Sequence, residues 1–159
     1  MFRVLLVLTL AIAAASGCGA AAAPADPSSE FATCATDERA MPYRAGMSVP
    51  SSAGVFTVKL LDSTPGPPVK GQNTWTVEVD EVSTGAALDG LDVSVVPRMP
   101  DHPSHGTRPV VVTPSGSGTY VLKPVYLYMS GVWEVSLVIV GATVGSGTTD
   151  SAVIPVCIP

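Results

Sequence analysis

Both histidines of this 159-residue sequence lie in one short segment, at His102 and His105, and a methionine precedes them at Met99. Imidazole and thioether groups together suit copper, above all Cu(I), better than the hard cations that prefer oxygen ligands. A further methionine, Met129, stands at a predicted turn after a later apolar run. The residue types therefore predict a copper site made of Met99, His102, His105 and Met129.

Proline is frequent around the two histidines, at Pro97, Pro100, Pro103 and Pro109. The proline ring fixes one backbone angle, so such a segment loses less entropy when its side chains converge on an ion. The spacing of the histidines is short and common, and other interpretations stay open. Histidines in a polar loop are most often solvent-exposed, and a methionine near a strand end usually belongs to the core. The segment could equally be a docking surface for a protein partner in the cell envelope.

The sequence carries no convincing motif for catalysis. It has no Gly-x-Ser-x-Gly, no His-Glu-x-x-His, no Walker loop, and no Gly-x-Gly-x-x-Gly that opens a helix. Asp101 adjoins His102, but adjacency in sequence does not make a catalytic dyad. We expect a protein that is not an enzyme.

The charge balance argues against nucleic acid as a partner. Eight Lys and Arg against thirteen Asp and Glu give a net charge of -5, and the basic residues are not clustered. Binding to a phosphate backbone needs clustered positive charge, so no nucleic-acid partner is expected.

The N-terminus is typical of an exported protein. Residues 1–17 combine a basic start with an apolar run that is too short to span a bilayer, as in a secretory signal peptide. The run ends at Ala15-Ser16-Gly17-Cys18, which resembles the lipobox of bacterial lipoproteins and predicts a lipid on Cys18. Residues 18–33 then form a flexible tether that leaves the domain facing the periplasm or the exterior. An alternative cleavage site at Ala23-Pro24-Ala25 would instead release a soluble protein.

Two of the three cysteines remain if Cys18 carries a lipid. Cys34 lies near the start of the mature chain and Cys157 near its end. In an oxidising compartment such a pair is expected to form a disulfide, which would close nearly the whole domain. The alternative is two independent buried thiols.

Residues 34–159 predict an all-β domain, an immunoglobulin-like β-sandwich of about seven strands. Apolar and polar residues alternate with period two, turn residues recur about every ten positions, and no helical periodicity is visible.

Cys34 to Val49 is expected to be irregular and to lie across the sandwich. Pro124 predicts an edge position or a bulge, and Tyr120 is either a tyrosine corner or an ordinary strand residue. The expected strands are Gly54–Leu60, Trp75–Asp80, Leu91–Pro97, Pro109–Thr113, Thr119–Tyr128, Val132–Val140 and Asp150–Cys157.

From about Thr74 to Val140 the sequence resembles the YtkA-like domain, akin to FixH-type proteins. The residues that carry the resemblance are Trp75 to Val82 with Gly85 and Leu88, Pro97 to His102 with His105 and Gly106, Gly118-x-Tyr120, and Met129-x-Gly131-x-Trp133.

The resemblance implies a bacterial, extracytoplasmic β-sandwich without enzymatic activity and with a link to copper handling or oxidase assembly. The positions that match its site are Met99, His102, His105 and Met129. Together with the export signal, it predicts a lipid-anchored copper carrier or sensor. The alternative is a metal-free binding or structural module that docks onto an envelope protein.

Overall fold

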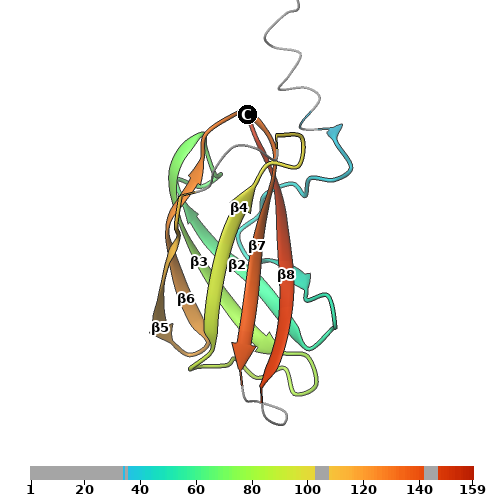
Figure 1. Ribbon diagram of the computed structural model, residues 1–159, viewed down its shortest axis with the longest axis vertical. Helices are drawn as coiled ribbons and strands as arrows, with labels where there is room; N and C mark the ends of the chain where they lie inside the picture. Colours follow the sequence, from blue (N-terminus) through green and yellow to red (C-terminus); the bar gives the residue numbers. More distant parts are fainter. Residues whose placement is uncertain (1–33, 35, 103–107, 142–146) are drawn as a thin grey trace, which may run out of the picture.

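Two antiparallel β-sheets pack face to face in the computed structural model, which describes residues 34, 36–102, 108–141 and 147–159 (Figure 1). The predicted signal peptide, Cys18, the predicted tether and His105 lie outside the described residues. Within the described chain, no helix has the length and hydropathy needed to cross a membrane. The strands are β1 Met47–Pro50, β2 Phe56–Thr64, β3 Gly71–Glu81, β4 Asp92–Arg98, β5 Val111–Gly116, β6 Thr119–Leu127, β7 Gly131–Gly141 and β8 Thr148–Ile158.

The strand order is that of an immunoglobulin-like sandwich. One sheet has the order β1-β2-β3-β6-β5, and the other has the order β4-β7-β8. Without β1, the seven strands reproduce the two sheets of a constant-type immunoglobulin domain, which hold the first, second, fifth and fourth strands and the third, sixth and seventh. The predicted all-β sandwich is therefore confirmed.

The period-two alternation of the sequence becomes the two faces of each strand. On β7, Trp133, Val135, Leu137 and Ile139 are buried, while Val138 on the opposite side is exposed. Successive side chains of a strand point to opposite faces, so one face of each sheet faces the core. The buried sets of the other strands complete this core, among them Phe56, Val58, Leu60, Trp75, Val77, Val79, Val93, Val95, Leu122, Leu127, Ile154 and Val156.

The structure has one strand more than the seven expected. β1 lies in the segment from Cys34 to Val49 that was expected to be irregular, and it pairs with β2 from Met47↔Leu60 to Pro50↔Thr57. Only Val49 of its four residues is buried. A strand this short shows no alternation in the sequence, and the backbone of β2 decides its conformation.

Pro124 lies at a bulge, one of the two positions expected for it. Asn73 on β3 pairs with Val125, and Trp75 pairs with Leu122, so β6 holds one extra residue over this interval. β6 lies between β3 and β5 and is not an edge strand. Proline has no N–H to donate to the neighbouring strand, and the bulge leaves one residue of β6 without a ladder partner at this point.

Tyr120 makes the bond back to upstream backbone that a tyrosine corner requires. Its hydroxyl donates to the Leu88 carbonyl oxygen at 2.8 Å and accepts from the Leu91 backbone N–H at 3.0 Å. Gly118 allows the start of β6 to lie close to Ala87, because a Cβ at position 118 would come within 2.6 Å of the Ala87 side chain. The hydroxyl thus fixes the connection that leads into β4.

Tyr120→Phe is expected to lower the free energy of unfolding by about 1–3 kcal/mol, because it leaves the buried Leu91 N–H without its acceptor. Urea denaturation followed by tryptophan fluorescence measures the change. Tyr126→Phe, on the same strand, is the control and should cost less than about half as much. Equal losses for the two variants would contradict the assigned role.

Candidate metal site

Three of the four predicted ligands line one pocket at the end of the sandwich where β4 ends and β7 begins. These are Met99, His102 and Met129, and we call the cavity the Met–His pocket. It has a volume of about 410 Å³. His105, the fourth predicted ligand, lies outside the described residues. The other lining residues are Cys34, Asp37, Arg39, Lys70, Asp101, Tyr128, Ser130, Gly131 and Val132.

Met99 follows the last residue of β4 and is only 7% exposed. The methyl group of its thioether lies over Gly131, in the space that a side chain at position 131 would occupy. Gly131 also has a φ of +127°, a backbone conformation that favours glycine. The Met99 carbonyl oxygen accepts a hydrogen bond from the His102 backbone N–H at 3.0 Å. A tight turn therefore leads from the buried Met99 to His102, which is exposed.

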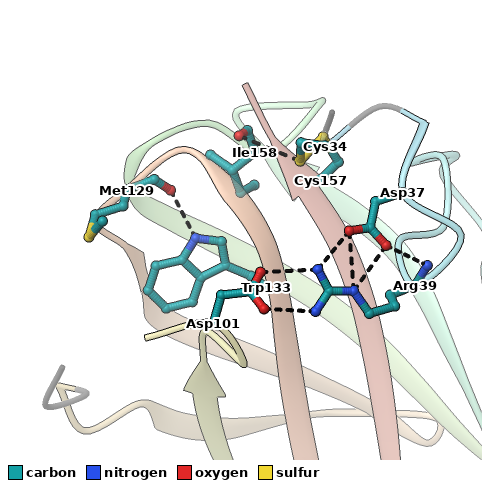
Figure 2. Close-up of a disulfide and its surroundings, with 8 residues drawn as sticks. All are labelled: Cys34, Asp37, Arg39, Asp101, Met129, Trp133, Cys157 and Ile158. Atoms are coloured by element: carbon teal, nitrogen blue, oxygen red, sulfur yellow. Dashed lines mark hydrogen bonds and ion pairs between the residues drawn. A yellow bond between two sulfur atoms is a disulfide. The ribbon is translucent and has the colours of Figure 1, made fainter. Parts of the chain in front are cut away.

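Met129 is half-buried, and Trp133 holds its backbone (Figure 2). The Trp133 indole Nε1–H donates to the Met129 carbonyl oxygen at 2.9 Å, and the ring is 2% exposed. Buried indole N–H groups usually have such a partner, although the buried Trp75 Nε1–H has none among the described residues. The spacing Met129-x-Gly131-x-Trp133 therefore has a physical cause: tryptophan fixes the methionine backbone, and glycine leaves room for Met99.

Arg39 links the start of the domain to the residue before His102 (Figure 2). Its two terminal nitrogens donate to the carboxylate oxygens of Asp101 at 2.9 and 3.0 Å. Its Nε and one terminal nitrogen also bind Asp37, at 3.0 and 2.7 Å. We call these three residues the Arg39 clamp. The fork of the guanidinium suits such paired contacts with carboxylates.

The Arg39 clamp lowers the pKa of both carboxyl groups. Hydrogen bonds from Arg39 hold the pKa of Asp37 at about 2, below its ordinary value of 3.8. The same guanidinium lowers the pKa of Asp101, and the nearby His102 adds a smaller effect in the same direction. Both carboxylates are therefore ionised at neutral pH.

Aromatic rings extend from one wall of the Met–His pocket. The Tyr128 ring stacks on Tyr126 with centroids 5.4 Å apart and lies 6.1 Å from the Trp133 ring. The Arg108 guanidinium lies over Tyr126, 4.6 Å from the ring centroid. Arg108 is the first described residue after the histidine segment, so both flanks of that segment are held: Asp101 by Arg39, and Arg108 by an aromatic ring.

The predicted disulfide is present and lies beside the pocket. Cys34 and Cys157 are bonded, with Cα atoms 5.5 Å apart, and join the first described residue to β8. Further along the same segment, the Met41 N–H donates to the Pro155 carbonyl oxygen at 3.1 Å. The disulfide and this hydrogen bond attach the segment that carries Asp37 and Arg39 at both of its ends.

The potential ligands of the Met–His pocket are two soft thioethers and one imidazole. Among the described residues, no three His, Cys, Asp or Glu side chains are grouped so that they could hold a metal ion. Charges of both signs surround the donors, from Arg39 and Lys70 and from Asp37 and Asp101. In the described part of the chain, this arrangement suits a soft, monovalent cation better than a hard one.

Sequence reasoning missed Arg39, Asp37, Cys34 and Tyr128 as parts of this pocket. Arg39 lies 62 positions from Asp101, and nothing in the spacing of either residue indicates the contact. The disulfide prediction was the one available signal, because it places the segment after Cys34 beside the end of β8.

The YtkA-like family profile matches residues 51–138, more than half of the chain. The chain belongs to the YtkA-like family. The matched region holds β2 to β6, most of β7, and Met99, His102 and Met129 of the Met–His pocket. No curated protein matches this YtkA-like chain in sequence.

Two solved structures of FetP from uropathogenic Escherichia coli resemble the YtkA-like chain in shape. A copper-bound variant of FetP is 11% identical, covers 73% of this chain and 96% of its own, and gives a TM-score of 0.46. The as-isolated FetP is 12% identical, covers 74% of this chain and 97% of its own, and gives a TM-score of 0.43. At these values neither likeness bears on the function of this protein.

Gly131→Ala is expected to displace Met99, because the new Cβ would meet its terminal methyl group. We expect a loss of about 1–3 kcal/mol in the free energy of unfolding. The measurement is urea denaturation, with the Met99 methyl resonance recorded by NMR. Gly85→Ala is the control, since Gly85 also has a positive φ but has no atom within 4 Å of an added Cβ. An unmoved Met99 resonance in Gly131→Ala would contradict this packing.

Arg39→Gln is expected to raise the pKa of Asp37 from about 2 towards its ordinary value of 3.8. A lowered pKa in the folded state stabilises the fold above pH 3.8, and this contribution disappears as the pH falls towards 2. The variant should lack that pH dependence. Carboxyl-carbon NMR titration measures the pKa directly, and Lys59→Gln, which breaks a different ion pair, should leave Asp37 unchanged. A low Asp37 pKa in Arg39→Gln would exclude the Arg39 clamp as its cause.

Proposed function

We propose that this protein binds Cu(I) in the Met–His pocket and acts as a copper carrier or sensor of the bacterial cell envelope, not as a catalyst. The observation that carries the proposal is the meeting of Met99, His102 and Met129 in one pocket, although Met129 lies 27 or more positions after the other two. His105 is proposed as a fourth ligand on the sequence alone. A lipid on Cys18 is proposed to anchor the protein, with the domain facing the periplasm or the exterior.

The chemistry of the donors supports Cu(I) over other ions. Thioethers are weak ligands for hard divalent cations, which prefer carboxylate or carbonyl oxygen. Two thioethers and an imidazole add no charge, so a bound monovalent ion would add one positive charge to the site. The charged side chains that line the pocket, Asp37 and Asp101 against Arg39 and Lys70, balance one another, so the donor atoms decide the preference for an ion.

The three donors differ in their access to solvent, which suits a protein that passes its metal on. Met99 is buried, Met129 is half-buried, and His102 is exposed. An acceptor protein would approach His102 first and could replace that ligand while the thioethers still hold the ion. Met99 and Met129 would retain the ion, and His102 would be the ligand that is exchanged.

Two contacts constrain the chain near two of the three donors. Trp133 fixes the Met129 backbone carbonyl, and Gly131 leaves room for the Met99 methyl group. Both contacts limit the freedom of the chain that metal binding would otherwise have to remove.

Competition with a Cu(I)-specific chelator, with ascorbate as reductant, tests the proposal on the purified exported protein. Met99→Leu, Met129→Leu and His102→Ala should each weaken Cu(I) binding by at least about tenfold. Leucine retains the apolar volume of methionine and removes only the sulfur donor. Met47→Leu is the matched control, because Met47 also packs against the core but does not line the Met–His pocket.

Two results would contradict the proposal. One is Cu(I) binding that the three pocket substitutions leave unchanged. The other is a melting temperature that Cu(I) does not raise, since a ligand specific to the folded state must stabilise it by mass action. The second result, together with capture of an envelope protein through the Met99 to His105 loop or a sheet edge, would favour the metal-free docking module.

A further inference from the structure

We propose that Arg39 is a positioning residue for His102, and that the Cys34–Cys157 disulfide controls metal affinity through Arg39. The inference rests on the proposed function and adds redox regulation of the same pocket. It is carried by a series of connections: the disulfide holds Cys34, the segment after Cys34 carries Arg39, Arg39 binds Asp101, and Asp101 directly precedes His102. Figure 2 shows the members of this series as far as Asp101.

The first link is the attachment of the segment that carries Arg39. Cys34 is covalently bonded to Cys157 of β8, and Met41 is hydrogen-bonded to Pro155 of the same strand. Apart from the disulfide, Cys34 makes a sulfur contact of 3.9 Å to the Ile158 carbonyl oxygen. Its own carbonyl oxygen accepts a bond of 3.4 Å from the Asp37 N–H, which lies within the same segment and does not attach it to β8. Sulfur is a weak hydrogen-bonding group, so the segment before Met41 would lose its main attachment.

The second link is the contact between that segment and the histidine loop. Arg39 and Asp101 share two nearly parallel N–H···O bonds of 2.9 and 3.0 Å, and Asp37 fixes the other side of the guanidinium. Both partners are about half exposed, with side chains 48% and 52% accessible. An exposed ion pair is weak unless its members are already held in place. The disulfide supplies that constraint by holding the segment of Arg39 against β8.

The third link is the position of Asp101 directly before His102. The His102 N–H donates to the Met99 carbonyl oxygen, so the backbone from Met99 to His102 is one closed turn. Arg39 holds this turn from outside through Asp101. Loss of the Arg39 clamp would release the Asp101 side of this turn, next to His102, while leaving Met99 and Met129 on the rigid sandwich.

Reduction is the chemical step that would operate the switch. A dithiol of the thioredoxin class transfers two electrons and two protons to the sulfur atoms of Cys34 and Cys157 and becomes a disulfide itself. The products in this protein are two thiols, and the Arg39 segment is released. Oxidation by a protein disulfide restores the bond, so the oxidised protein is the form that retains Cu(I).

A double-mutant cycle tests whether the disulfide acts on Cu(I) affinity through Arg39. Cu(I) affinity is measured by competition with a chelator, with ascorbate as reductant. The four proteins are the native protein, the Cys34→Ser/Cys157→Ser variant, Arg39→Gln, and the variant with all three substitutions. Removing the disulfide and removing Arg39 should each weaken Cu(I) binding by about tenfold. The triple variant should be no weaker than either parent, because both changes break the same series of connections. Arg39→Lys should restore only part of the affinity, since lysine lacks the guanidinium fork.

A second readout needs no metal. Amide hydrogen exchange of His102 should be faster in the disulfide-free variant and in Arg39→Gln, and equally fast when both changes are combined. Asp150→Asn is the stability control. Asp150 accepts hydrogen bonds from the Ala53 and Val55 N–H groups near the other end of β8 and has no contact with the Arg39 clamp. It should lower the melting temperature without changing His102 exchange or Cu(I) affinity.

The outcomes separate this inference from the proposed function. If the native protein binds Cu(I) through Met99 and Met129 but the disulfide-free variant binds equally well, the regulation is wrong and the copper site stands. Additive losses in the triple variant would likewise exclude Arg39 as the intermediary. Tighter binding after reduction of the native protein would mean that the freed thiolates become ligands, which also contradicts the proposal. If the native protein does not bind Cu(I), the proposed function and its regulation both fail.

Discussion

Packing of the two apolar sheet faces against each other decides where every other part of this molecule lies. Burial of one face per strand determines the register of β2, β3, β4, β6, β7 and β8, because a shift of one residue would turn each buried set outward. Burial of apolar area is the main stabilising contribution to such a fold. The loops at the sheet ends are therefore held on a rigid support. The Met–His pocket lies on one of these ends, where β4 leaves the core at Met99.

Trp133 connects that support to the pocket. Its indole is part of the core, and its N–H holds the Met129 backbone. Gly131 lies between them and leaves the space that the Met99 methyl group fills. Gly131 and Trp133, which the sequence places close together, thus constrain two potential ligands at the ends of the paired strands β4 and β7. The disulfide and the Arg39 clamp constrain the segment after Cys34 and, through Asp101, the turn that holds His102.

The sequence predicts the sandwich, most of its strands, the disulfide and the family. These features leave local signals: alternation for β7, a proline within an apolar run for the bulge at Pro124, and a cysteine pair after a predicted export signal. It does not predict β1, whose conformation depends on the backbone of β2, nor the Arg39 clamp, whose members meet only after the ends of the domain are joined. Chemistry and compartment singled out Met99, His102 and Met129, which the structure places in the lining of one pocket. The contacts of Gly131 with Met99 and of Trp133 with Met129 could be found only in three dimensions.

The central claim is that thioether sulfur from both Met99 and Met129 binds copper. X-ray absorption at the copper edge of the Cu(I)-loaded protein tests it most directly, because sulfur and nitrogen scatter differently. The account predicts two sulfur neighbours per copper with nitrogen from imidazole, and one sulfur neighbour in Met129→Leu. A copper environment of nitrogen and oxygen alone, unchanged in Met129→Leu, would contradict it.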